Sequence, residues 1–255
     1  MSVDAVVLGG GDGGVIDPSC RFKGLLPIGG RPMIEWVVDA MRAAELVHEV
    51  AVVVPTAEDL GPWVDKVDKL VVSRGGFMTN VAAGVDSFRS DRPILISTGD
   101  IPTVIAADVD SFVRASIATG ADFTYPLISK EDVLAAYPGS ERTYVRLATG
   151  AVTGGNMALV NPLLVRTNRE IGQRLFDTRK NAIQMARILG LGFVVRLAAG
   201  RLVPAEVEAK MGQLLGGTAA AVFTDRAAIG ADVDKPGDVV VAERVLYELA
   251  AGEEA

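Results

Sequence analysis

Blocks of apolar residues along the chain alternate between two periodicities, which predict strands and helices in turn. The runs 4–8 and 93–97 are almost wholly apolar, as in strands buried on both faces of a sheet. Between Met33 and Met41 the apolar residues recur at helical spacing. The predicted strands are 4–8, 49–54, 69–72, 93–97, 121–127, 143–147, 155–160, 193–197 and 219–224. The predicted helices are 33–41, 58–64, 77–88, 109–117, 130–137, 169–189 with a break near Thr178, 206–215, and a last helix opened by 232–238.

This alternation favours an α/β fold of three layers, α/β/α, with a Rossmann-like, mainly parallel mixed sheet. We expect one domain over residues 1–250, followed by a tail at 251–255. The pattern becomes less regular after Ser129, so we interpret 129–228 as an elaboration of the sheet on the side of the acceptor substrate.

Composition excludes several classes of protein. A net charge of −7 argues against a nucleic-acid-binding protein, which would normally carry a basic stripe. No apolar run approaches the roughly 20 residues of a membrane span, and no signal peptide is recognisable, so we expect a cytoplasmic protein that does not bind membranes. With one cysteine and one histidine, the chain can form neither an internal disulfide nor a site of several histidines. We expect His48 to lie at the surface rather than in a catalytic triad.

The first predicted strand runs into a glycine-rich segment that could bind phosphate. Glycine permits positive φ angles and leaves backbone N–H groups accessible to an anion, and Lys23 further on could meet a phosphate oxygen. A Walker A loop is excluded, because no Gly-Lys-Ser/Thr follows, and the dinucleotide motif fits poorly, because no helix begins at once. We assign a nucleoside triphosphate to this loop, with the candidate residues Leu8, Gly9, Gly10, Gly11, Asp12, Gly13, Gly14, Arg21 and Lys23.

Acidic residues at two distant places could hold a metal ion. Asp100 follows the strand 93–97, and ligands of open α/β sheets bind at the carboxyl ends of strands. Asp232 and Asp234 alternate along an extended segment, so both carboxylates point to one side. These three residues are candidate ligands for Mg²⁺ or Mn²⁺, with helix capping as the competing interpretation. Asp238, near the third helical position, suits the positive end of the last helix.

Two further groups of residues could form the base and acceptor pockets. Gly75 and Gly76 at a strand end could pack under a base whose edge Asn80 reads, unless Asn80 simply faces solvent. Glycines beside an amide and an arginine also suggest an acceptor pocket, although glycine kinks in a strand are an equal alternative. The acceptor candidates are Arg142, Tyr144, Gly155, Asn156, Arg179 and Lys180.

Together these residues resemble a known family. The run from Leu8 to Gly11, continued by Lys23-Gly24-Leu25-Leu26-Pro27-Ile28-Gly29-Gly30-Arg31-Pro32, is similar to the start of GT-A-like nucleotidyltransferases, the MobA-like NTP transferases. These are related to the molybdenum-cofactor guanylyl- and cytidylyltransferases and to the sugar-1-phosphate nucleotidylyltransferases. The resemblance implies that the glycine loop and Lys23 bind the triphosphate and that Asp100 binds Mg²⁺. It also implies a second metal ligand in the segment Asp232–Asp238, which matches D-x-D-x-P-x-D.

The expected activity is Mg²⁺-dependent transfer of NMP from an NTP, CTP or GTP in particular, to a small phosphorylated acceptor, with release of pyrophosphate. Lys23 and Asp100 are the expected catalytic residues. The family usually has an arginine after the glycines, where this chain has Gly13-Gly14-Val15, and Arg21 is the candidate substitute. The alternatives are a nucleotide-sugar-dependent glycosyltransferase of the same fold, a catalytically degenerate nucleotide-binding regulatory module, and a Rossmann-type dehydrogenase. A homodimer through Val194–Leu197 is a further expectation.

Overall fold

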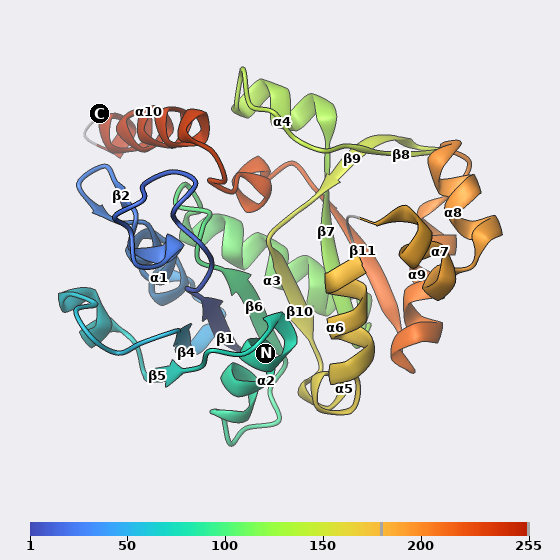
Figure 1. The fold of residues 1–255 in the computed structure, drawn as a ribbon, viewed down its shortest axis with the longest axis horizontal. Coiled ribbons are helices and arrows are strands. Elements are labelled where there is room, and N and C mark those ends of the chain that lie inside the picture. Colours follow the sequence, from blue (N-terminus) through green and yellow to red (C-terminus); the bar gives the residue numbers. More distant parts are fainter. Residues whose placement is uncertain (179–180, 254–255) are drawn as a thin grey trace.

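The computed structural model describes residues 1–178 and 181–253, and over these residues the chain forms a central sheet with helices on both faces (Figure 1). The strand order is β5-β4-β1-β6-β10-β7-β9-β8, and β11 pairs with the other side of β7. The strands of this sheet are β1 Val3–Leu8, β4 Val47–Val54, β5 Lys69–Val72, β6 Ile94–Thr98, β7 Phe123–Ser129, β8 Val145–Leu147, β9 Gly150–Gly154, β10 Met157–Val160 and β11 Ala219–Thr224. The helices are α1 Met33–Ala43, α2 Phe77–Asp86, α3 Ala106–Thr119, α4 Lys130–Ala136, α5 Pro162–Thr167, α6 Arg169–Thr178, α7 Ala182–Leu189, α8 Leu191–Ala198, α9 Pro204–Leu215 and α10 Pro236–Glu253.

The predicted α/β fold with a mainly parallel mixed sheet is confirmed. Strand β1 pairs in parallel with β4 and β6, and β4 with β5, which forms the regular first half of the sheet. The second half is mixed, because β10 runs antiparallel to both β6 and β7 while β11 is parallel to β7. Since β1 and β6 end at the same edge, the segments that follow Leu8 and Thr98 start side by side.

Side chains of β1 alternate between two hydrophobic cores, one on each face of the sheet. Val3, Ala5 and Val7 pack with the buried faces of α1 and α3. Val6 faces the opposite way and packs with α2 and α5. Both faces of this strand are therefore covered, which explains why its sequence is an apolar run rather than an alternation.

The C-terminal helix α10 returns to the N-terminal part of the fold. In Figure 1 it lies beside the small hairpin of β2 (Pro27–Ile28) and β3 (Arg31–Pro32), and Val233 and Ala242 pack against Leu26 and Ile28. This packing brings the acidic segment at 232–234 back to the carboxyl end of β6, where the backbone N–H of Val233 donates to the carbonyl of Asp100 at 2.9 Å.

Several predicted elements were wrong. Residues 193–197, predicted as a strand, belong to helix α8, because Phe193 and Leu197, four residues apart, pack against the core while Val195 between them is exposed. The predicted helix 58–64 is a 3-10 helix at Pro62–Lys66, the tail through residue 253 continues α10, and β9 and α5 were missed. Within the described residues no helix is both long and apolar enough to cross a membrane.

Candidate functional site

The glycine-rich segment folds back on itself, and this returns Lys23 to the end of β1. The backbone N–H of Lys23 donates to the carbonyl of Gly11 at 3.0 Å. Gly11 has a φ of +107°, a conformation that favours glycine. Gly24 lies directly against β1, since a Cβ there would stand 2.6 Å from the carbonyl oxygen of Gly9. The loop is long, yet these close backbone contacts place Lys23 next to the first glycines.

The loop leaves open space on its outer side. No atom would meet a Cβ at Gly10 within 4 Å, whereas Gly13 is packed against Cys20. Asp12 accepts a hydrogen bond from the backbone N–H of Gly14 at 2.8 Å and so shapes the turn. The space over Gly10 is where a ligand can approach the bare backbone.

Lys23 joins two of the predicted acidic residues. Its ammonium donates to Asp100 Oδ2 at 2.5 Å and also to Asp234 Oδ1. Thr98, the last residue of β6, donates to the other carboxylate oxygen of Asp100 at 2.5 Å. Although burial disfavours the charge of Lys23, the neighbouring carboxylates raise its pKa above the ordinary value. Lys23 is therefore charged at neutral pH and has a largely buried side chain, which is 10% exposed.

The third carboxylate, Asp232, is bonded to Arg142. One guanidinium nitrogen pairs with Asp232 Oδ1, and Nη2 donates to the main-chain oxygen of the same residue at 2.7 Å. Burial raises the pKa of Asp232 to about 6; Arg142 opposes this shift, and the charges of Asp100 and Asp234 add to it. Burial acts to raise the pKa of Asp234, but the bond and charge of Lys23, together with Asp232 and Arg142, lower it below the ordinary value.

The three carboxylates are close enough to share a cation. Asp100, Asp232 and Asp234 each offer an oxygen, and these atoms lie within 4.8 Å of one another. Two protein cations, Lys23 and Arg142, are bonded to these three carboxylates. Carboxylate oxygens are the ligands that Mg²⁺ prefers, so the residues present fit a divalent cation.

Asp238 stabilises the end of the acidic segment, as the sequence predicted. Its Oδ2 accepts hydrogen bonds from the backbone N–H groups of Asp234 and Lys235, both at 2.9 Å. This cap at the start of α10 holds the backbone that carries Asp234 beside Lys23.

The residues predicted to bind the base lie at the amino end of α2, on the sheet face opposite to α1. Gly75 and Gly76 lead into α2, and Asn80 accepts a hydrogen bond from the Ser73 hydroxyl at 2.6 Å. Gln173 of α6 accepts from the backbone N–H of Met78 at 2.9 Å, and a Cβ at Gly76 would meet this side chain at 3.0 Å. Helix α6 therefore covers this turn, a contact between distant segments that the sequence did not indicate.

The predicted substitute for the missing arginine has other partners. Arg21 Nη1 donates to Asp59 Oδ2 at 3.0 Å and to the carbonyl of Glu58 at 3.3 Å. Val15, which follows the glycines, is 72% exposed. The guanidinium of Arg21 is thus bonded to residues 58–59.

The predicted acceptor residues divide into two places. Gly155 and Asn156 lie between β9 and β10, where a Cβ at Gly155 would meet Pro126 at 2.7 Å, so close packing requires this glycine. Tyr144 packs in a small core with Tyr137, and its buried hydroxyl has no hydrogen-bond partner among the described residues. Arg179 and Lys180 lie outside the described residues.

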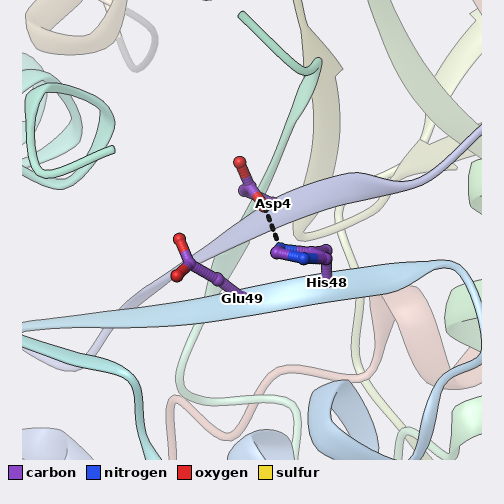
Figure 2. Close-up of side chains that lie close together, drawn as sticks. All are labelled: Asp4, His48 and Glu49. Atoms are coloured by element: carbon purple, nitrogen blue, oxygen red, sulfur yellow. Dashed lines mark ion pairs between the residues drawn. The ribbon is translucent and has the colours of Figure 1, made fainter. Parts of the chain in front are cut away.

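A second cluster that could hold a cation lies at the opposite end of the sheet. Figure 2 shows Asp4 of β1 facing His48 of β4, with Glu49 beside them. His48 is exposed as predicted, and its Nδ1 lies 3.4 Å from Asp4 Oδ1. Ser90 donates to Asp4, so the carboxylate stands between serine and histidine, which is not the order of a catalytic triad.

The charges of this second cluster are already matched. Arg92 Nη1 lies 3.5 Å from Asp4 Oδ1, and Lys69 pairs with Glu49. We therefore interpret the cluster as a buried carboxylate held by its own protein cations, far from the glycine loop along β1.

Thr98 and Tyr125 are residues near the site that the sequence reasoning missed. Thr98 was visible as the neighbour of Gly99-Asp100, and its hydroxyl orients the Asp100 carboxylate. For Tyr125 the sequence carries no signal; burial and the charge of Asp232 raise the pKa of its hydroxyl, which places it near the acidic residues.

Comparisons with known proteins identify the family of the chain. The family model of the MobA-like NTP transferase domain matches residues 5–181. A hypothetical transferase from Thermus thermophilus has 34% sequence identity and a TM-score of 0.83, with 94% of this chain and 100% of that chain covered. No curated protein matches the chain.

Two more distant structures share the fold. The CMP:2-keto-3-deoxy-manno-octonic acid synthetase complexed with CTP has 12% identity and a TM-score of 0.60, covering 97% of this chain and 99% of that chain. The 2-C-methyl-D-erythritol 4-phosphate cytidylyltransferase from Thermus thermophilus has 18% identity and a TM-score of 0.55, covering 97% of this chain and 100% of that chain. The match of the family model over most of the chain, on a fold whose glycine loop meets a carboxylate cluster, shows that the protein belongs to the MobA-like NTP transferase family and is a nucleotidyltransferase.

Proposed function

We propose that this enzyme transfers NMP from an NTP to a small phosphorylated acceptor, with Mg²⁺ as its cofactor. The observation that carries the proposal is the meeting of Lys23, Asp100 and Asp234 at the glycine-rich loop, where Lys23 is bonded to Gly11. Such chemistry requires a bound triphosphate, neutralised charge and an aligned acceptor more than an acid–base pair. A single exposed histidine is consistent with this requirement.

The chain's own residues have separate roles in this proposal. Backbone N–H groups from Gly10 to Gly13 would bind phosphate oxygens, whereas that of Gly14 already donates to Asp12. Asp100, Asp232 and Asp234 would hold the metal. When bound, Mg²⁺ neutralises phosphate charge. The ammonium of Lys23 is bonded to two of the carboxylates that would hold the metal, so it would be available to a phosphate oxygen if those carboxylates bound the cation instead. Arg142 holds Asp232 in place and balances part of its charge.

CTP and GTP are the nucleotides we propose to test first. The distant structural neighbours include a synthetase described with CTP and a cytidylyltransferase, but their likeness establishes the fold alone. Within this chain, Gly75, Gly76 and Asn80 are the residues we propose to contact the base.

Pyrophosphate release from each of four NTPs with Mg²⁺ and phosphorylated acceptors tests the proposal. Asp100→Asn should lower release by about 10²-fold or more, the scale of losing one preorganised charge contact. Asp59→Asn, at a carboxylate that is 89% exposed and bonded to Arg21, is a matched control and should lower it far less. Equal release by wild type and Asp100→Asn would refute the proposal.

One observation supports the alternative of a regulatory nucleotide-binding module. The family usually has an arginine after the glycines, and Arg21, the candidate substitute here, is bonded to residues 58–59 instead. Calorimetry distinguishes the two functions. NTP binding without pyrophosphate from any acceptor would favour the module over the transferase.

A further inference from the structure

A large apolar cavity lies beside the carboxylate cluster. It has a volume of about 510 Å³, within the range of small-molecule sites, and lies between the sheet face of β1, β6 and β10 and the helices α2, α5, α6 and α9. The cavity is on the α2 side of the sheet, the same face on which Val6 packs. None of the roles assigned above to Lys23 or the three carboxylates uses this space.

The walls of the cavity are suited to hydrocarbon rather than to charge. Phe77 and Phe176 stack with their ring centroids 4.0 Å apart on the helical side. Met78, Met157 and Met211 contribute flexible thioether side chains, which adapt to apolar ligands of irregular shape. Asn168, also in the lining, donates its amide to the carbonyls of Leu164 and Leu215 at 3.0 and 2.9 Å. Its amide nitrogen is therefore already engaged with the protein backbone.

The polar part of the cavity is joined to the site. Thr98 lines the cavity and donates to Asp100 at 2.5 Å. The carbonyl of Asn156, a second lining residue, accepts from the backbone N–H of Thr98 at 3.0 Å. Tyr125, a third, has its hydroxyl packed against Gly154, two residues before Asn156. Thr98 thus separates the cavity from Asp100 by a single hydrogen bond, while the apolar walls continue along α5 and α6.

We propose that this cavity binds the hydrocarbon part of the acceptor, so that the acceptor is a phosphomonoester with an apolar alkyl or aromatic group. The assignment rests on the proposed function. The acceptor phosphate lies at the Thr98 end, next to the carboxylates and their cations, and the hydrocarbon extends over Met157 and Ala158 towards the two phenylalanines.

The transfer balances without a proton or a redox partner. An oxygen of the acceptor phosphate forms a bond to the α-phosphorus of the NTP. The bond from that phosphorus to the oxygen bridging to the β-phosphorus breaks, and pyrophosphate leaves with the electron pair. The product is a nucleoside diphosphate ester of the apolar alcohol.

A series of n-butyl, n-hexyl and n-octyl phosphate, below micellar concentrations and with Mg²⁺ present, measures the cavity directly by calorimetry. Burial of each methylene should tighten binding about fourfold, since a buried CH₂ contributes about 0.8 kcal/mol. Inorganic phosphate is the reference without hydrocarbon. Equal affinity along the series would overturn the proposal.

Three variants test the position of the hydrocarbon. Ala158→Phe fills the cavity from β10 and should remove most of the gain from butyl to octyl phosphate. Leu175→Ala, in a helix without fully buried residues, removes wall contacts and should weaken octyl phosphate several-fold while leaving butyl phosphate nearly unchanged. Leu163→Ala is the control, because this leucine is 61% exposed and lies outside the cavity.

Circular dichroism establishes first that each variant is folded, and if Ala158→Phe is not, Leu175→Ala decides. If Ala158→Phe weakens NTP binding as much as it weakens octyl phosphate binding, the proposal is overturned and the base of the NTP occupies the cavity. NTP-induced thermal stabilisation without any acceptor tests the proposed function separately. Octyl phosphate that binds in the cavity but releases no pyrophosphate from an NTP that does bind would overturn its assignment as the acceptor.

Discussion

Asp232 gives a prediction that links stability, pH and metal binding. Burial and two neighbouring carboxylates raise its pKa to about 6 in spite of Arg142, against an ordinary 3.8 in the unfolded chain. Between these values the folded protein binds more protons than the unfolded chain, so stability falls as pH rises from about 4 to about 6. Above pH 6 the charged carboxylate costs the fold up to about 3 kcal/mol, from a pKa difference of about two at 1.36 kcal/mol each.

Asp232→Asn removes this charge and keeps the shape of the side chain. The amide oxygen can still accept from Arg142, and Arg142 Nη2 stays bonded to the main-chain oxygen of residue 232. Without metal at pH 7.5 the variant should therefore be more stable than wild type by up to about 3 kcal/mol. The free energy of unfolding of the variant should also lack the decrease between pH 4 and 6 that ionisation of Asp232 causes in wild type.

Mg²⁺ should narrow the difference in stability between the two proteins. A ligand at 100 times its Kd stabilises the folded state by about 2.7 kcal/mol, and wild type offers three carboxylates where the variant offers two. Wild type should gain more from Mg²⁺ in urea unfolding, and this gain should grow as pH rises through 6, because protons and metal compete for Asp232.

Asp225→Asn is the control for this experiment. Its side chain is 82% exposed, so the same chemical change should alter stability little and leave the Mg²⁺ effect intact. The reasoning is refuted if Asp232→Asn is less stable than wild type without metal at pH 7.5, or if Mg²⁺ stabilises both equally.

Three further predictions test the loop and its supports. Gly24→Ala should lower the free energy of unfolding in urea by about 1–3 kcal/mol and weaken NTP binding in calorimetry, because the new Cβ would stand 2.6 Å from the Gly9 carbonyl. The control Gly192→Ala, in open space within α8, should be neutral or stabilising. Equal destabilisation by both substitutions would contradict the packing argument. Lys23→Met should lower NTP-dependent pyrophosphate release by about 10²-fold or more, since a charged contact is lost; unchanged release would exclude a role for the ammonium. Asp238→Ala should destabilise the fold by about 1 kcal/mol in urea unfolding, because the α10 cap is lost. It should also weaken Mg²⁺ binding measured by calorimetry, because the cap holds the backbone of Asp234. A Mg²⁺ affinity equal to that of wild type would show that Asp234 needs no such support.

Sequence patterns predicted the structure correctly where the residues of a single segment determine its conformation. The apolar run of β1, the helical spacing in α1 and the acidic segment before α10 each formed as expected. The signal failed at 193–197, where a short apolar run fits a strand or a helix equally well and packing against Leu147 and Leu202 decides.

The sequence by itself determined the α/β fold, the glycine-rich loop with Lys23, and the three candidate carboxylates, because each depends on residue types at short spacing. The tertiary structure alone decided how these parts meet. It showed that Lys23 bridges Asp100 and Asp234, that Arg142 is bonded to Asp232, and that Arg21 is bonded to residues 58–59. It also revealed the cavity between Thr98 and α6. The physical reason is that these contacts join segments distant along the chain, and packing such as that of α10 against Leu26 and Ile28 sets which of them meet.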